Sequence, residues 1–403
     1  MSLNETVSAE RVHIGFFGMR NAGKSSLVNA LTGQSLSVVS PVKGTTTDPV
    51  KKAMELLPLG PVVIVDTPGI DDEGELGELR VQKAKEILSR IDIAVLVVDA
   101  LKGLSAREEA LIGVFKEKKL PWVAAYNKAD LLTERKNGVF YVSAVTGEGI
   151  GALKEKLGDF AKALHTDKTV LQGLVSPGDT VALVIPIDAS APKGRLILPQ
   201  QQVLRELLDL GAIALCVQPE GLAAALGGLT KPPRLVITDS QAFGRVAKTV
   251  PESVPLTSFS ILFARYKGEL GLLLAGAKTL KNLQTGDRVL ISEGCTHHRQ
   301  CGDIGTVKLP AWIKEYTGAE PSFAFTSGGE FPEDLSPYRL IVHCGGCMLT
   351  ETQMKARLSS AAAWNVPVLN YGMAIAAMYG ILDRAMRPMV APQARQLNCA
   401  SHS

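Results

Sequence analysis

The stretch GMRNAGKS (residues 18–25) decides the fold of the first part of the chain. It fits the pattern G-x-x-x-x-G-K-[ST], follows an apolar run at residues 12–18 and opens a helical stretch expected over 23–31. Glycines let backbone N–H groups close around phosphate oxygens, and a helix N-terminus adds partial positive charge. Lys24 is suited to contact the terminal phosphates, and Ser25 to bind Mg²⁺. The nucleotide contacts expected in this loop are Asn21, Ala22, Gly23, Lys24, Ser25 and Ser26.

Strands and helices are expected to alternate around this loop. Continuous apolar runs at 12–18, 61–67, 93–100 and 122–128 are typical of strands buried on both faces of a parallel sheet. Helical stretches are expected over 23–31, 79–89 and 106–118. The pattern predicts a doubly wound α/β domain built on a nucleotide-binding P-loop.

The chain has 403 residues, which predicts two or three domains. A polar stretch between residues 165 and 179 is expected to be a linker. Two smaller α/β domains are expected after it, the third opening with a helix that runs from near Phe263 through Asn282. The predicted domains are 1–167, 175–262 and 263–403.

Composition excludes several classes of protein. Apolar residues make up 46% of the chain and charged residues 21%, which is ordinary for a globular protein. The net charge of +3 gives no support for a nucleic-acid partner. Residues 358–382 carry no charge, but Pro367 and Gly372 would break a membrane helix, so a buried helix–strand–helix is expected. The N-terminus has no apolar signal-peptide core, so a cytoplasmic protein without a membrane partner is expected.

Four further motifs specify the nucleotide. Asn127-Lys128-Ala129-Asp130 follows a predicted strand, and a carboxylate there can accept both the ring N–H and the exocyclic amine of guanine. Asp66 is suited to the outer shell of Mg²⁺ and Gly69 to a backbone contact with the γ-phosphate. Ser143 and Ala144 form the last loop beside the base, and residues 44–48 lie where a switch loop would close on the metal. GTP is therefore the expected ligand.

The order of these motifs resembles the translation-factor-like GTPases, in the branch that contains Era and the tRNA-modifying MnmE proteins. The resemblance implies that Thr46 ligates Mg²⁺ and that Asn21 helps to hold K⁺ beside the phosphates. Ile70 stands where Ras-like proteins have a glutamine that positions water, so slow hydrolysis and a switch function are expected. The residues expected to support hydrolysis are Lys24, Thr46, Asp66 and Gly69.

Cysteines and histidines gather in the last third of the chain. Cys295-Thr-His297 follows one predicted strand, and His343-Cys344-Gly-Gly-Cys347 ends another. Thiolates at the ends of two strands could converge on one metal site, and the glycines let the chain wrap closely around it. Soft sulfur ligands favour zinc or an iron–sulfur cluster, and the residues alone leave both open.

The combination of this cysteine motif with an Era/MnmE-like GTPase domain closely resembles the HydF family, the maturation GTPases of FeFe-hydrogenase. The resemblance implies a 4Fe–4S cluster on Cys295, Cys344 and Cys347, and a middle domain that forms a homodimer. It also implies a scaffold that carries a transient diiron subcluster to apo FeFe-hydrogenase, with the two radical-SAM maturases as further partners. The fourth iron ligand stays open among His297, which is favoured, His343, another side chain and solvent, with Cys301 as a competitor for a ligand role.

Two alternatives remain at this stage. One is a K⁺-stimulated GTPase with a structural zinc module. The other is an RNA-associated GTPase like Era or MnmE, but no basic run follows residue 271, as an RNA surface would require.

Overall fold

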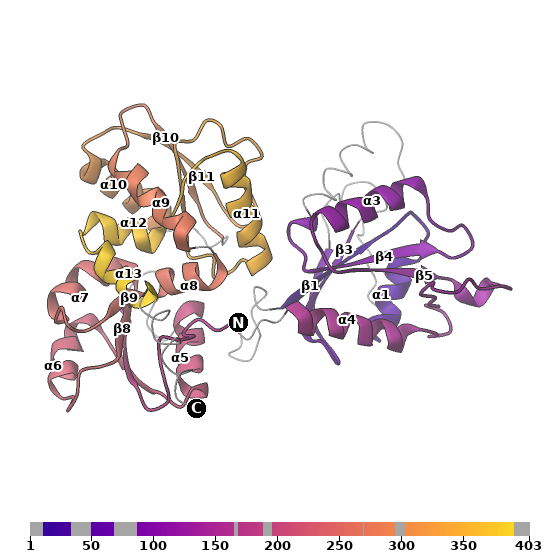
Figure 1. Ribbon diagram of the computed structural model, residues 1–403, viewed down its shortest axis with the longest axis horizontal. Coiled ribbons are helices and arrows are strands. Elements are labelled where there is room, and N and C mark those ends of the chain that lie inside the picture. The colour runs from indigo at the N-terminus through magenta and orange to yellow at the C-terminus, as the bar shows by residue number, and fades with distance from the viewer. Residues whose placement is uncertain are drawn as a thin grey trace, which may run out of the picture. The chain divides into compact units, whose positions relative to one another are not determined.

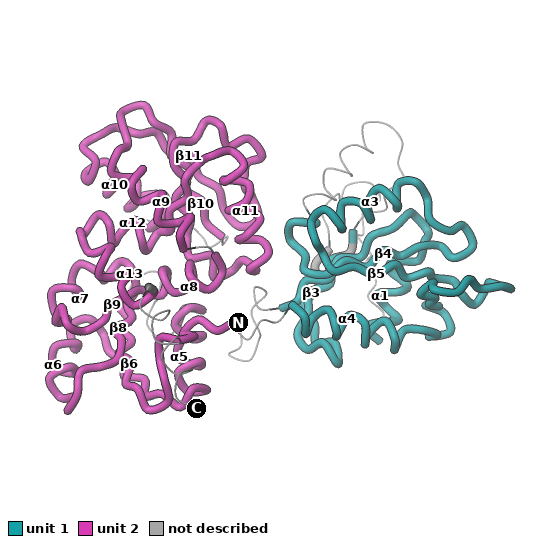
Figure 2. Tube along the Cα trace, in the orientation of Figure 1, with its two compact units in different colours: residues 1–167 teal, residues 168–403 magenta. Residues whose placement is uncertain are grey.

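The computed structural model describes residues 11–33, 50–67, 87–164, 168–187, 196–268, 270–294 and 303–390. The chain divides into two compact units, residues 1–167 and 168–403 (Figure 2).

Unit 1 is built around one five-stranded sheet. Its strands are β1 (Val12–Phe17), β2 (Val50–Leu56), β3 (Gly60–Asp66), β4 (Ile93–Asp99) and β5 (Trp122–Asn127). They lie in the order β2-β3-β1-β4-β5. Strands β1, β3, β4 and β5 pair in parallel, whereas β2 pairs antiparallel with β3. The parallel strands carry their C-terminal ends to one edge, where the nucleotide loops emerge.

Helices cover both faces of this sheet (Figure 1). Strand β4 is buried along its whole length, with Val95 and Val97 facing one core and Leu96 and Val98 the other. Helices α1 (Lys24–Thr32) and α4 (Ile150–Leu164) pack into the first core, and α3 (Ala106–Glu117) packs into the second. This arrangement confirms the predicted doubly wound α/β domain, because strands covered on both faces need apolar side chains on both.

Unit 2 contains two four-stranded sheets, and all of their strand pairs are parallel. The strands of the first are β6 (Thr180–Val184), β7 (Ile213–Val217), β8 (Leu235–Thr238) and β9 (Leu256–Ser258). Those of the second are β10 (Arg288–Ser292), β11 (Ser322–Thr326), β12 (Leu340–His343) and β13 (Val368–Asn370). The strand orders are β7-β6-β8-β9 and β11-β10-β12-β13. One continuous buried core joins the two sheets, so the predicted pair of smaller α/β folds shares its interior.

The helices of unit 2 follow the strands in alternation. The longer ones are α5 (Leu198–Asp209), α8 (Phe259–Lys267), α9 (Leu270–Lys281), α10 (Leu309–Thr317), α11 (Glu351–Ala363), α12 (Tyr371–Met378) and α13 (Leu382–Val390). The shorter ones are η3 (Pro219–Gly221), α6 (Leu222–Gly227), η4 (Ser240–Ala242), α7 (Phe243–Thr249) and η5 (Ile304–Lys308).

Helix α8 lies where the two sheets of unit 2 meet (Figure 1). Ser258 caps its N-terminus by accepting from the backbone N–H of Ile261. The single helix predicted from near Phe263 through Asn282 is wrong, because the structure breaks it at Gly268 into α8 and α9. A Cβ at Gly268 would approach the carbonyl oxygen of Ala264 to 2.9 Å, so this close turn favours glycine. The predicted domain boundary at residues 262–263 falls inside α8.

The uncharged segment 358–382 forms the C-terminal part of α11, then β13, then α12. Its residues Leu358, Ala361, Leu369 and Met373 lie in the core, which confirms the predicted buried helix–strand–helix. Within the described residues, no helix combines the length and the apolar character needed to cross a bilayer.

Candidate functional site

The P-loop connects β1 to α1 in unit 1. Gly18 has φ 144°, and a Cβ there would lie 2.2 Å from the carbonyl oxygen of Val97, so only glycine fits beside β4. Gly23 (φ 87°) stands at the N-cap of α1 in the left-handed region, and no side chain caps this terminus. The first N–H groups of α1 therefore open onto the loop, where a phosphate can accept from them.

Lys24, the first residue of α1, lies over this loop. Its ammonium donates to the carbonyl oxygens of Gly18 (2.9 Å) and Met19 (3.0 Å), and the residue is 9% exposed. Asn21 adopts a left-handed backbone conformation (φ 63°) and is exposed, as are Ser25 and Ser26, while Ala22 is buried. A phosphate bound in this loop would replace the two carbonyl oxygens as acceptor of the Lys24 hydrogen bonds.

Asn127, the last residue of β5, ties the two ends of the site together. Its Nδ2 donates to the carbonyl oxygen of Ala22 at 3.0 Å, and its Oδ1 accepts from the backbone N–H of Ala144 at 3.0 Å. A single buried amide therefore fixes the P-loop and the Ser143–Ala144 loop relative to each other. Asn127 is 105 residues from Ala22 and 17 residues from Ala144 in sequence, so only the folded chain brings the three residues together.

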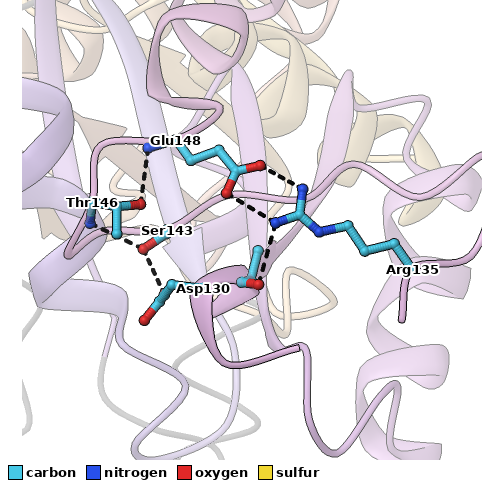
Figure 3. A network of polar contacts seen from close by, with 6 residues as sticks. Asp130, Arg135, Ser143, Thr146 and Glu148 are labelled. Atoms are coloured by element: carbon cyan, nitrogen blue, oxygen red, sulfur yellow. Dashed lines mark hydrogen bonds and ion pairs between the residues drawn. The ribbon is translucent and has the colours of Figure 1, made fainter. Parts of the chain in front are cut away.

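The loop beside the base is a hydrogen-bonded network (Figure 3). Asp130, in the turn η2 (Ala129–Leu131), accepts from the Ser143 hydroxyl at 2.6 Å, which orients its carboxylate. Ser143 also accepts from the backbone N–H of Thr146 at 3.1 Å. Arg135 braces the outside of the loop by donating to Glu148 and, at 3.3 Å, to the carbonyl oxygen of Ala129.

Lys128 extends across the same edge of the sheet to Asp99. The ammonium lies 2.5 Å from Asp99 Oδ2, at the end of β4. Burial alone would raise the pKa of Asp99, but hydrogen bonds from Lys128 and from the backbone N–H of Leu101 more than offset it, so the pKa is lowered. The predicted base-side residues Asn127, Lys128, Asp130, Ser143 and Ala144 thus meet at one edge.

Several predicted residues of the nucleotide site cannot be placed. Thr46 and Gly69 lie outside the described residues, and so does residue 70. Asp66 ends β3, but only its backbone is described. Its neighbour Thr67 donates its hydroxyl to the carbonyl oxygen of Phe16 at 2.6 Å, which fixes the end of β3 against β1. The roles of Thr46, Asp66 and Gly69 therefore stay predictions.

The cysteine loop, residues 344–349, begins where β12 ends in unit 2. Because β12 pairs in parallel with β10, Ser292 lies opposite His343 and the two strands end side by side. The Cys344 sulfur accepts from the backbone N–H groups of Gly294 (3.0 Å) and Gly346 (3.4 Å). Gly294 directly precedes Cys295 in the sequence, so the chain leading to the first motif touches the first sulfur of the second.

The two described thiols of this loop, Cys344 and Cys347, are half-buried. Burial raises the pKa of Cys344 to about 11, and burial also raises the pKa of Cys347. Each thiol must lose its proton when it binds a metal. Cys295, His297, His298 and Cys301 lie outside the described residues, and among the residues that are described no three His, Cys, Asp or Glu side chains form a metal site.

His343 does not fit the fourth-ligand role that the sequence left open for it. Arg357 of α11, which can only donate, contacts His343 Nε2 at 2.9 Å, so this nitrogen carries the lone pair. Nδ1 therefore carries the proton and donates to the carbonyl oxygen of Cys344 at 2.8 Å. Burial, and then the charge of Arg357, lower the pKa of His343 to about 3. The ring is neutral, with both nitrogens engaged.

Arg357 itself is buried beneath the strands that carry the cysteine motifs. Its guanidinium donates to Ser292 Oγ at 3.2 Å and to the carbonyl oxygen of Gly328 at 2.5 Å, and it lies 5.2 Å from the centre of the Phe331 ring. Sequence reasoning missed Arg357. Its only signal was an arginine on the helix expected from Thr350, where arginines are normally exposed.

Three family models together match most of the chain. A model described as a 50S ribosome-binding GTPase matches residues 13–128. The Hydrogen maturase F dimerization domain matches residues 170–268, and the Hydrogen maturase F tetramerization domain matches residues 271–388. The break between the last two falls at the end of α8.

Curated relatives match the first unit. GTPase Der of Kosmotoga olearia is 30% identical over 189 residues, which are 41% of this chain and 42% of that protein. The tRNA modification GTPase MnmE of Chromobacterium violaceum is 34% identical over 156 residues, 37% of this chain and 34% of that protein. The chain thus spans less than half of the length of either relative. Era of Aquifex aeolicus, in a crystal structure with GDP and AlF4⁻, is 20% identical with a TM-score of 0.33, covering 51% of this chain and 92% of that one.

The phosphate loop, the Asn127–Asp130 motif and the matching family model define the class of this protein: it is a P-loop GTPase. The two domains that follow specify it further. The chain belongs to the HydF family, the hydrogen maturase GTPases. It matches the dimerization and tetramerization domains of that family, which supports an oligomer, whereas the sequence predicts a homodimer.

Proposed function

We propose that this protein is a GTPase-controlled scaffold. It holds a 4Fe–4S cluster on Cys295, Cys344 and Cys347 and carries a diiron subcluster to apo FeFe-hydrogenase. The two radical-SAM maturases that build the subcluster are its further partners. Dimerisation is assigned to residues 175–262 and cluster binding to residues 263–403, with α8 at their junction.

The contact between Gly294 and Cys344 carries this proposal. Its N–H···S hydrogen bond of 3.0 Å joins the segments that hold the two cysteine motifs, 50 residues apart. The residues present fit a thiolate-bound cluster, because the Cys344 sulfur receives two backbone N–H groups at the end of a buried strand. With three thiolate ligands, the cluster keeps one iron whose fourth ligand is not cysteine, and this iron can exchange ligands with a cargo.

This chain's own residues supply the rest of the scaffold. Arg357 engages His343 and keeps it from the metal, so a ligand from elsewhere completes the site. His297 remains our proposal for that ligand. Asp130 and Lys24 bind guanine and the phosphates, Ser25 and Thr46 hold Mg²⁺, and Asn21 helps to hold K⁺. Hydrolysis at this site acts as a switch on partner binding.

Anaerobic reconstitution with iron and sulfide tests the cluster. We expect about four irons per chain and a paramagnetic signal on reduction, and we expect Cys347→Ala to lose hydrogenase activation in an anaerobic mixture. Stoichiometric zinc without a 4Fe–4S signal would instead establish the structural zinc module. Replacing K⁺ by Na⁺ during GTP turnover tests the role of Asn21, with slower turnover expected in Na⁺.

A further inference from the structure

Lys267 is a buried cation at the C-terminal end of α8, in the segment that matches the dimerization domain. The residue is only 3% exposed. Its ammonium donates to the carbonyl oxygens of Gly346 (3.1 Å), Cys347 (3.2 Å) and Leu349 (2.6 Å). One side chain therefore binds three carbonyl groups of the cysteine loop, from 79 to 82 residues away in sequence.

These three contacts set the direction of the peptide groups in the loop. In a trans peptide the C=O and the following N–H point in opposite directions. Carbonyls of residues 346 and 347 that face Lys267 therefore turn the N–H groups of Cys347 and Met348 the other way. Burial raises the pKa of Cys347, and the charge of Lys267 and the backbone N–H groups of Met348 and Cys347 offset only part of that rise. The N–H groups turned away from Lys267 are thus those of Cys347 and of the residue that follows it.

Helix α8 contacts the loop a second time, two turns earlier. Ser260 lies seven residues before Lys267, on the same face of the helix. A Cβ on Gly345 would lie 3.4 Å from Ser260 Oγ, so the loop passes close to this hydroxyl. Ser260 also donates to Asn370 Oδ1 of β13 at 3.0 Å, which ties the helix to the second sheet. The same face of α8 therefore supports both ends of the Cys344–Cys347 segment.

Charges of both signs surround the loop. Arg357 approaches it through His343, and Glu293, which accepts from Tyr371 at 3.4 Å, contributes a negative charge felt by Cys344. Lys267 contacts the loop backbone directly, and its positive charge acts on Cys347. In a buried setting this charge acts strongly on an anionic group nearby.

We propose that Lys267 is a positioning and charge-compensating residue for the cysteine loop: it orients the peptide N–H groups toward the Cys347 sulfur and stabilises the reduced, more negative state of a thiolate-bound cluster. This inference rests on the cluster-binding function proposed above. It assigns to the dimerization segment a direct part in setting the reduction potential, since hydrogen bonds to sulfur and local charge are the protein's means of tuning it.

Spectroelectrochemical titration of the reconstituted full-length protein tests this role. Lys267→Met removes the charge and the hydrogen bonds, whereas Lys267→Gln removes the charge but keeps N–H donors for the carbonyls. In both variants we expect the equilibrium to shift about tenfold toward the oxidised cluster. This shift lowers the reduction potential by about 59 mV for a one-electron couple. We also expect Lys267→Met to retain less iron than Lys267→Gln. Lys355→Met is the matched control, because it removes an exposed ammonium from α11 in the same unit.

The outcomes separate this inference from the proposed function. If the unmodified protein binds no iron–sulfur cluster, the proposed function fails. If it binds the cluster but both Lys267 variants keep its iron content and its potential, the role of Lys267 is wrong while the scaffold stands. A shift of the same size in Lys355→Met would also overturn the role, as would loss of the folded state in both Lys267 variants by circular dichroism, since Lys267 would then serve the fold in general.

Discussion

The P-loop and the cysteine loop are alike in outline and different in their support. Each follows a buried parallel strand, contains glycines and leads into a helix: β1 into α1, and β12 into α11. Each also has a lysine whose ammonium donates to carbonyl oxygens of the loop. Lys24, however, lies on α1, the helix that directly follows the P-loop, whereas Lys267 lies on α8, far from the cysteine loop in sequence.

This difference separates a loop that a ligand can rearrange from one that the fold holds in place. Two carbonyls bind Lys24, and a phosphate can replace them with a stronger, charged acceptor. Three carbonyls of the cysteine loop, including that of Cys347 itself, bind Lys267 in a buried position. The nucleotide site is thus built to respond, and the cysteine loop to keep its shape.

The largest effect is expected from Cys344→Ala. The Cys344 sulfur accepts the Gly294 N–H that joins the two cysteine motifs, so its loss removes a ligand and the contact together. We expect nearly all iron to be lost after reconstitution, while GTP turnover is unchanged. Cys216→Ala, on the exposed β7, is the control and should keep its iron. Full iron content in the Cys344 variant would contradict the scaffold.

Lys24→Ala tests the other loop. Removing the ammonium that faces the phosphates should lower the rate of GTP hydrolysis by about 10²–10³-fold, as expected when a preorganised charge is lost. Iron content should not change, because Lys24 belongs to the other unit. Lys116→Ala, on the exposed face of α3, should hydrolyse GTP normally. Normal turnover in Lys24→Ala would place the nucleotide elsewhere.

Ser143→Ala measures how much the base-side network contributes to GTP affinity. Losing the 2.6 Å hydrogen bond to Asp130 leaves the carboxylate less well oriented, at a cost of about 1 kcal/mol. We expect roughly fivefold weaker GTP binding by calorimetry. Thr146→Ala is matched to it, because the Thr146 hydroxyl contacts only the rim of the network at 3.4 Å, and it should bind GTP normally. Equal affinities in both variants would remove Ser143 from the site.

The smallest effect concerns acid stability. The pKa of Asp99 is lowered in the folded state, so its contribution to stability is present above its unfolded pKa near 3.8 and is lost as pH falls through the folded pKa. Asp99→Asn should therefore lower the free energy of unfolding of unit 1, measured by urea denaturation at pH 7, by about 1 kcal/mol. Below pH 4 the loss should be smaller. The same reduction at both pH values would show that the ion pair with Lys128 is not its source.

The comparison also explains what sequence could predict. The P-loop and Asn127-Lys128-Ala129-Asp130 were readable because each keeps its chemistry within a few neighbouring residues. The arrangement around Cys344 was not, since Gly294, Lys267 and Arg357 reach it from three distant segments and carry no motif. The helix break at Gly268 escaped prediction for a related reason, because a close approach to Ala264 is visible only in three dimensions. Cys295 and His297 remain predictions.

The single interior shared by both sheets of unit 2 has a practical consequence. A fragment that is to contain the folded cysteine loop must include α8, although this helix matches the preceding dimerization domain. A truncation made at the family boundary after residue 268 would expose apolar surface on both fragments and strip the loop of its lysine. We therefore expect the two halves of unit 2 to unfold in a single cooperative transition.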